Sequence, residues 1–154
     1  MDDLIADLAA QEERLLFSRF DNDDAWALGC LLVDLAKTRT LPVTIDIRRH
    51  GHQLFHAAMP GTAPDNDRWI DRKVRVVERL NASSFLVGRR MAAKGEAFDE
   101  RYGVDPADYA THGGAFPIRV RHVGVVGVVT VSGLPQADDH ALVVEALERF
   151  LGTA

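Results

Sequence analysis

Hydrophobic and other positions alternate with a period of two near the end of the chain, the pattern of a strand with one buried face. The run from Phe116 to Arg121 has this alternation, and the run 125–131 that follows it is almost wholly apolar. Residues 122–124 between the two runs include a glycine, and two β-rich runs around such a break predict a β-hairpin. The near-continuous valine of the second run indicates that both faces of that strand are covered.

A second hairpin is predicted by a similar alternation over residues 43–48. His50-Gly51 suits a two-residue turn because glycine accepts a positive φ, and 53–59 would then be the return strand. With a two-residue turn, Asp46 faces Phe55. A three-residue turn would reverse every such facing, so both registers stay open.

Apolar residues recur at helical spacing in the other segments, with polar residues on the opposite side. The predicted helices are 2–14, 25–36, 65–80, 83–94 and 136–151. In the second helix only Asp34 is charged, so this helix is expected to be central or covered by a partner subunit. Two apolar stripes contain an unexpected residue, which is Lys73 in the third helix and His140 in the fifth.

Five strands separated by helices predict an α/β fold of the α+β type, with a mostly antiparallel five-stranded sheet flanked by helices. The predicted strands are 15–17, 43–48, 53–59, 116–121 and 125–131. At 154 residues, with 47% hydrophobic and 27% charged residues, the chain is expected to form a single domain over 1–154. Residues 95–111 have no clear period and are expected to form a long connection, where functional groups often lie.

Charge and cysteine content argue against several classes of function. The net charge of −5 gives no general attraction to nucleic acid or anionic membranes. The single cysteine, Cys30, excludes an internal disulfide and a cysteine-cluster metal site, so no structural metal is expected. The acidic residues at 2–3 are unlike the basic start of a secretory signal, and no apolar run reaches the roughly 20 residues that a membrane helix needs. We therefore expect a cytoplasmic protein.

The order of motifs in the last third of the chain resembles the GlcG/HbpS-like family, small proteins described as haem-binding or haem-degrading. The matching residues are Gly113, Gly114, Pro117, Ile118, Val126, Gly127, Val131, Ser132, Gly133 and Asp139. The segment 58–69 is similar to a less characterised branch of that family, and with it the resemblance covers most of the chain from Trp26 onward. The resemblance implies a profilin-like sheet with helices packed against it, and haem or a related tetrapyrrole as the ligand.

The first candidate for chemistry is His112, which precedes Gly113-Gly114 where a loop meets a strand. Glycines there would let a ligand approach the backbone, and the imidazole could bind haem iron or move a proton. The alternative is that the glycines only form a turn and that His112 caps it.

The second candidate is His140, for which two readings stay open. A histidine in an apolar stripe is often a core residue bonded to a carbonyl group. Alternatively, His140 lines a pocket together with Ser132 and Asp139, because titratable groups inside proteins cluster at functional sites.

Cations of the third predicted helix are also candidates. Lys73 is expected to extend its ammonium group to water or, if it cannot, to pair with an anion such as Asp46 or a ligand's acid group. On the far side of the same helix lies an arginine ridge, which consists of Arg68, Arg72, Arg75 and Arg79. It is expected to be a solvated face paired with acids one turn away, or else to receive propionates or a partner's acidic patch.

Three hypotheses of function follow. The first is a ligand-binding protein for haem or a related tetrapyrrole, with or without slow haem breakdown. Its cofactor-binding residues would be His112, Gly113, Gly114, Ser132, Lys73 and His140, with His112 or His140 as the iron ligand. The second is a homo-oligomeric interaction module without chemistry, suggested by the apolar stretches 25–36 and 125–131. The third is a small-molecule enzyme that uses Lys73 and Asp46. The sequence contains no complete catalytic motif.

Overall fold

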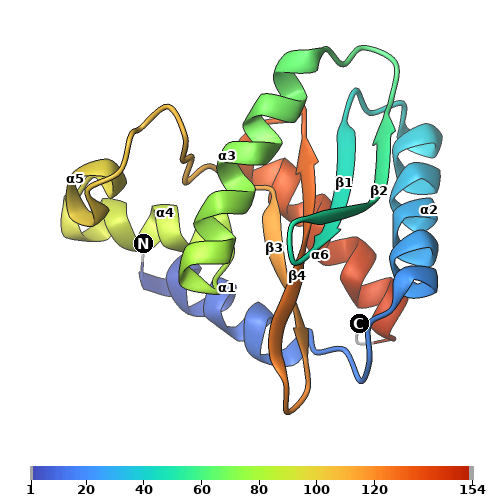
Figure 1. The fold of residues 1–154 in the computed structure, drawn as a ribbon, viewed down its shortest axis with the longest axis horizontal. Coiled ribbons are helices and arrows are strands. Elements are labelled where there is room, and N and C mark those ends of the chain that lie inside the picture. Colours follow the sequence, from blue (N-terminus) through green and yellow to red (C-terminus); the bar gives the residue numbers. More distant parts are fainter. Residues whose placement is uncertain (1, 153–154) are drawn as a thin grey trace.

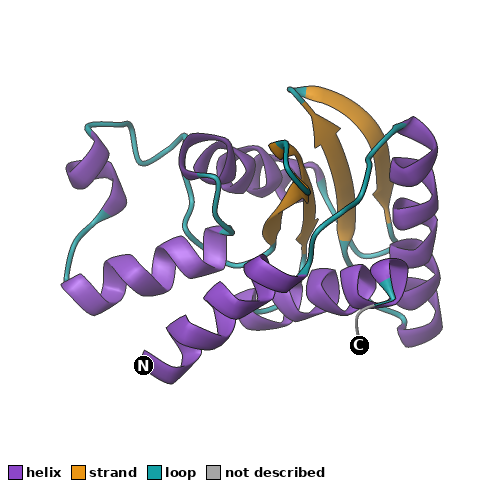
Figure 2. Cartoon of the chain, turned by 90° about the horizontal axis from the view of Figure 1, so that it is seen from below, coloured by secondary structure: helices purple, strands orange, loops and turns teal. Residues whose placement is uncertain are grey.

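The chain forms one antiparallel sheet with helices on both of its faces (Figure 1). The computed structural model describes residues 2–152. The elements in chain order are α1 (Asp2–Arg14), α2 (Asn22–Arg39), β1 (Thr44–Arg49), β2 (His52–Ala58), α3 (Pro64–Leu80), α4 (Ser84–Lys94), α5 (Phe98–Tyr102), β3 (Ala115–Val120), β4 (Gly124–Ser132) and α6 (Gln136–Leu151). The view in Figure 2, turned by 90°, shows the strands enclosed between helices.

The sheet has four strands in the order β2-β1-β4-β3, and each neighbouring pair is antiparallel. One face packs on α2 and α6, and the two central strands bury an apolar cluster against these helices. Its residues there are Ile45, Ile47, Val129 and Val131. The opposite face lies under α3, where Val128 packs against Ile70 and Val74. Because side chains alternate along a strand, Thr130 and Ser132 share that second face with Val128.

The α+β class with an antiparallel sheet is confirmed, but the prediction of five strands is wrong. The run predicted as a first strand contributes a single isolated parallel bridge, between Phe17 and Val120. The Phe17 amide donates to the Arg119 carbonyl at 2.8 Å, and the Phe17 carbonyl accepts from the Arg121 amide at 2.8 Å. Apolar residues 15–17 are therefore buried beside β3 without forming a ladder.

The first hairpin has the two-residue turn, with His50 at φ 52° and Gly51 at φ 78°. The predicted facing of Asp46 and Phe55 is nevertheless wrong, since Asp46 lies opposite His56. A bulge between Ile47 and Arg48 shifts the register by one residue, and this reverses the facing just as a longer turn would have done.

The predicted helices are present, with small changes at their ends. Helix α2 begins at Asn22 because Asp21 and Asp24 form a capping box, in which each side chain accepts from the other residue's amide. The long connection 95–111 contains the short helix α5. Within residues 2–152, no helix is both long and apolar enough to cross a membrane.

Candidate functional site

A pocket of about 270 Å³ opens where β4 ends and α6 begins, beside the first turns of α3. It is lined by Asp65, Asn66, Trp69, Lys73, His112, Gly113, Ser132, Gly133, Leu134, Gln136 and Asp139. Of the six residues predicted to bind a cofactor, four line this pocket, which are Lys73, His112, Gly113 and Ser132. Gly114 lies directly behind Gly113, and His140 is elsewhere.

Lys73 forms the buried floor of the pocket. Its side chain is 3% exposed, and its ammonium group donates to the carbonyls of Gly113 (2.9 Å) and Val131 (3.0 Å) and to Asp139 Oδ2 (3.3 Å). These three contacts use all three N–H groups of a protonated lysine. Lys73 therefore reaches neither water nor Asp46, and its side chain holds the glycine turn to the end of β4.

Asp139 completes this buried pair from the first turn of α6. Its carboxylate accepts hydrogen bonds from the backbone amides of Leu134 at 2.9 Å and Gly133 at 3.3 Å, in addition to the one from Lys73. Burial raises the pKa of Asp139 and lowers the pKa of Lys73, and the attraction between the two charges opposes both shifts. The pair connects α3, β4 and α6 at one point.

The glycine pair is packed against the protein itself. A Cβ atom on Gly114, which has φ of 136°, would lie 2.6 Å from Lys73 Nζ and would clash with the Val131 carbonyl oxygen. A Cβ atom on Gly113 would clash with the Gln136 carbonyl oxygen. The two glycines thus allow the turn before β3 to close tightly over Lys73.

The imidazole of His112 is accessible to a bound molecule. Its side chain is exposed and stands edge-on to Trp69, with ring centroids 5.1 Å apart and planes at 79°. Neither ring nitrogen of His112 makes a hydrogen bond to any part of the chain that the structure describes. Partial burial, together with the positive charges of Lys73 and Arg72, lowers the pKa of His112, so the ring is neutral at pH 7.

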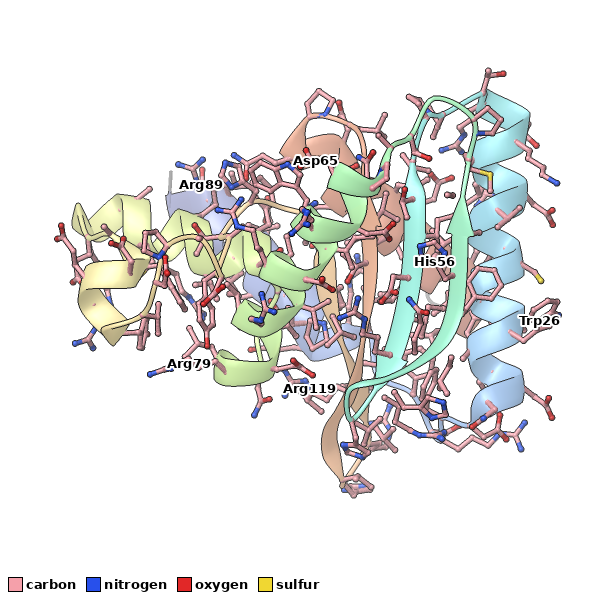
Figure 3. All side chains as sticks on the ribbon, turned by 45° about the horizontal axis from the view of Figure 1, so that its top comes forward. Trp26, His56, Asp65, Arg79, Arg89 and Arg119 are labelled. Carbon is pink, nitrogen blue, oxygen red and sulfur yellow. The ribbon has the colours of Figure 1, made fainter. Side chains whose placement is uncertain are left out.

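Three hollows meet at His112. Besides the first pocket, His112 lines a hollow of about 370 Å³ between α3, α4 and α5, and another of about 180 Å³ against α4. Arg72 lines the former and Arg89 the latter. In Figure 3, Arg89 and Asp65 lie on the same side of the molecule. We call the three hollows that share His112 the His112 groove.

His140 does not line the first pocket. It is 3% exposed, its Nε2 lies 2.7 Å from Gln11 Oε1 on α1, and its ring packs against those of Phe85 and Phe116. Burial lowers the pKa of His140 to about 4, so the ring is neutral at pH 7. The structure does not bring His112 and His140 together, and His140 resembles the core histidine of the alternative reading, bonded to a side-chain carbonyl.

Asp46 belongs to a different cluster, on β1 under α3. It is fully buried, accepts from Gln53 at 2.6 Å and pairs with Arg48 at 2.8 Å, and burial raises its pKa. Arg48 also pairs with Asp71 at 2.7 Å. The expected Lys73–Asp46 partnership is therefore replaced by two separate ion pairs.

The arginine ridge is exposed as expected at Arg68, Arg75 and Arg79. Most of its members bond carbonyl groups of the connection 95–111 and not the expected acids one turn away. Arg72 donates to the carbonyls of Pro106 and Tyr109, Arg75 to that of Asp108, and Arg79 to that of Tyr102. Arg72 also lies over the Trp69 ring, 4.6 Å from its centroid. These contacts fix the wall of the second hollow.

Sequence reasoning missed Asn66, Trp69 and Gln136 as pocket residues. Asn66 and Trp69 lie in the first turns of α3, and Gln136 begins α6, where its side-chain oxygen accepts the Gly113 amide at 3.0 Å. The sequence contained one usable signal. Polar residues at the starts of two helices converge if both helices begin at the same edge of the sheet.

The fold and the pocket define an α/β protein in which a histidine-glycine-glycine turn, the end of β4 and the start of α6 surround a small hollow. The family model described as "Haem degrading protein HbpS-like" matches residues 20–148, so the chain belongs to the HbpS-like family. The resemblance seen in the sequence is confirmed.

Relatives cover nearly the whole chain. A UPF0303 protein of Streptomyces coelicolor is 66% identical over 148 residues, which are 96% of this chain and 94% of the relative. A UPF0303 protein of Edwardsiella ictaluri is 51% identical over 151 residues, with 98% and 96% covered.

Solved structures have the same fold. The Ybr137w protein is similar with a TM-score of 0.89 and 34% identity, over 97% of this chain and 89% of that one. HbpS has a TM-score of 0.66 and 18% identity over 88% and 92% of the two chains. The complex of PduOC with heme has a TM-score of 0.69 and 17% identity over 83% and 92%. At such identities the last two likenesses concern the fold alone.

Proposed function

We propose that this protein binds haem or a related tetrapyrrole in the His112 groove, with the His112 imidazole as the iron ligand. The observation that carries the proposal is an exposed imidazole whose nitrogens have no hydrogen-bond partner within residues 2–152, in surroundings that lower its pKa and so favour the neutral ring. A neutral ring nitrogen is what haem iron requires of an axial histidine. The family description, which names haem, and the heme complex of PduOC support the choice of ligand.

The size of the hollows decides how such a ligand would lie. The first pocket, at about 270 Å³, is smaller than the roughly 300–1,000 Å³ of pockets that enclose drug-sized ligands. A tetrapyrrole would therefore lie across the His112 groove, covered on one face and partly exposed on the other. Trp69, edge-on to His112, offers an apolar ring beside it.

The charges around the groove suit a ligand with carboxylates. Arg72 and Arg89 line the two hollows that flank the first pocket, and guanidinium groups bind carboxylates well. Asp65 supplies an opposite charge at the far rim. We therefore propose that the propionates of the ligand lie on the side of the groove that Arg72 and Arg89 line.

The other predicted residues have distinct roles in this proposal. Ser132 lines the first pocket beside Asn66, whose amide lies 3.5 Å from the Ser132 hydroxyl, and both could bond a polar edge of the ligand. Lys73, Gly113 and Gly114 hold the turn that carries His112. When bound, haem would supply the redox chemistry of its iron, and the chain would supply ligation and a partly dry surface.

A hemin titration of the purified protein tests the proposal. We expect a Soret shift that saturates at one hemin per chain, and His112→Ala should weaken binding by at least about tenfold. His52→Ala, which removes an exposed histidine at the start of β2, is the matched control and should bind as the wild type does. The proposal is wrong if hemin produces no shift, or if the two variants bind equally.

Haem breakdown, which the family description names, is the finer part of the proposal. It needs oxygen and a reductant in addition to the bound haem. With ascorbate in air, the Soret band of the complex should decay faster than that of His112→Ala mixed with hemin. Equal decay would contradict the proposal of haem breakdown and would not affect the proposal of haem binding.

A second candidate function is self-association without chemistry, and an exposed tryptophan on α2 favours it. It is compatible with haem binding, because α2 contributes no residue to the His112 groove. A cytoplasmic location stays a prediction from the sequence.

A further inference from the structure

The outer side of α2 carries a large exposed aromatic residue. Trp26 is 64% exposed, while Cys30 and Val33 in the following turns are half-buried. Figure 1 shows α2 at the border of the molecule, and Figure 3 shows Trp26 on its outer side. Exposed apolar surface of this kind commonly marks a contact with another molecule.

The spacing of this outer row is that of a helix-pairing seam. Asp23, Trp26, Cys30, Val33 and Lys37 follow each other at steps of three, four, three and four residues. This is the a/d repeat along which two helices pack side by side. The centre of the row is apolar, and its two ends carry opposite charges.

The charges at the ends are available for a partner. Within residues 2–152, Asp23 and Lys37 have no ion pair, whereas their neighbours are engaged inside the chain. Arg39 makes a bidentate bond to Glu145, with both contacts at 2.7 Å, and Asp24 belongs to the capping box at the start of α2. The helix thus presents one acid and one base on its outer row.

Trp26 is held in place before any partner arrives. Its ring meets that of Phe55 on β2 at 5.5 Å, with planes at 68°. Phe55 sits directly on Gly29 of α2, where an added Cβ would overlap the ring, so helix and strand are in close contact at this point. A fixed aromatic side chain loses little conformational entropy on binding, which is typical of an interface anchor.

We propose that α2 pairs with α2 of a second copy of this chain, antiparallel, about a two-fold axis that passes near Cys30. Asp23 and Lys37 lie seven residues before and after Cys30. An antiparallel pair therefore places Asp23 of each copy opposite Lys37 of the other. The same operation puts Trp26 of each copy opposite Asp34 and beside Val33 of the other.

The symmetry of the row is the reason for choosing a second copy over a different partner. A two-fold interface must be self-complementary, since each residue meets its counterpart from the other copy. A row with an acid at one end, a base at the other and apolar residues between them meets this condition only when antiparallel. The nearby free edge of β2 is a weaker candidate, because a bulge interrupts that strand and bulges protect edges from pairing.

Sedimentation of the full chain over a range of concentrations tests the interface. We expect a dimer as the smallest unit of assembly. Lys37→Asp should raise its dissociation constant about tenfold, because two ion pairs per dimer become repulsive. Trp26→Ala should raise it about 30-fold, a loss typical of an aromatic anchor.

The charge swap Asp23→Lys combined with Lys37→Asp is the decisive control. It restores opposite charges across an antiparallel pair and should return the dissociation constant to that of the wild type. A parallel pair, or a contact elsewhere on the molecule, predicts no such rescue. A monomer at all concentrations, or a dimer indifferent to these variants, would overturn the proposal.

Cys30 gives an independent readout. As the chain has one cysteine, any disulfide-linked dimer must join two copies of Cys30. Mild oxidation should cross-link the wild type and the charge swap, and should cross-link Lys37→Asp much less at equal concentration. Equal cross-linking of all three would show that the row does not pair as proposed.

Discussion

The two faces of the sheet are built from different chemistry. On the α2 and α6 side, the central strands bury the apolar residues Ile45, Ile47, Val129 and Val131, and only Arg49 at the end of β1 is polar. On the α3 side, the same strands present Thr44, Asp46, Thr130 and Ser132, which are buried as well. Both faces therefore contain fully buried residues, but the fully buried polar groups of the central strands lie on the second face and need partners.

This difference separates stability from chemistry within one small fold. The apolar face needs only close packing, whereas buried polar groups on the other face need partners. Asp46 has them, but the hydroxyls of Thr44 and Thr130 have no partner within residues 2–152. Lys73 lies on the α3 side and holds the turn that carries His112, and Asp139 reaches Lys73 from the start of α6 at the end of β4. The two histidines follow the same division, with His140 neutral in the core and His112 neutral at the surface.

The largest expected effect comes from breaking the buried pair on the polar side. Lys73→Ala leaves the Asp139 carboxylate buried without its cation, and we expect the free energy of unfolding to fall by about 3–5 kcal/mol. Lys73→Met combined with Asp139→Asn removes both charges and should lose clearly less. Urea denaturation measures both, and a loss below about 1 kcal/mol for the single variant would contradict a stabilising pair.

The next effect concerns acid and the core histidine. The pKa of His140 is about 4 in the folded protein, below the value near 6.5 of an exposed histidine. Between these two values the unfolded state binds the proton, so stability is complete above pH 6.5 and falls as the pH drops toward 4. The full difference between the two pKa values corresponds to a loss of about 3 kcal/mol in the free energy of unfolding.

His140→Leu should remove this loss of stability at low pH. Urea denaturation at several pH values would then show a smaller loss of stability between pH 6.5 and 4 in the variant than in the wild type. Parallel curves for the two proteins would mean that His140 is protonated inside the folded core.

A smaller effect compares two adjacent positions of β1 that face opposite sides. Ile45→Val removes one methyl group from the apolar face and should cost about 0.5–1.5 kcal/mol. Thr44→Val is a matched change on the polar face, where the Thr44 hydroxyl is fully buried and has no hydrogen-bond partner within residues 2–152. Because the new methyl group replaces an unpaired hydroxyl of similar size, stability should be unchanged or slightly higher. A clear loss with Thr44→Val would indicate that the hydroxyl is bonded to water.

The smallest effect on stability is expected at His112, the proposed iron-binding residue. His112 is exposed, so His112→Ala should change the free energy of unfolding by no more than about 0.5 kcal/mol. A large change in the melting temperature would mean that His112 supports the turn and that any loss of haem binding is indirect.

The sequence predicted the helices and strands well, but it did not predict which residues contact one another. The β1 and β3 strands were predicted by their period of two, β4 by its apolar run, and α3 and α6 by their apolar stripes, because these signals lie within a few residues of each other. The bulge in the first hairpin has no such signal, so the facing of Asp46 could not be obtained. Residues 15–17 were apolar enough for a strand, but only Phe17 pairs with a neighbour.

The site was predicted where local chemistry sufficed. His112, the first glycine after it and the lysine in an apolar stripe all lie at the first pocket, although whether that pocket is the functional site stays a prediction. Their partners lie far along the chain, with Asp139 66 residues from Lys73 and Gln11 129 residues from His140. Such pairings depend on tertiary packing, which a single sequence does not reveal.

Chemical rescue tests the central claim, iron ligation by His112, most directly. Hemin is added to His112→Ala, free imidazole is then supplied, and the absorbance spectrum is compared with that of the wild-type complex. We predict that the Soret positions of the variant and the wild type differ without imidazole, and that both reach the same position when imidazole is present. A variant whose spectrum already equals that of the wild type without imidazole would show that His112 is not the ligand.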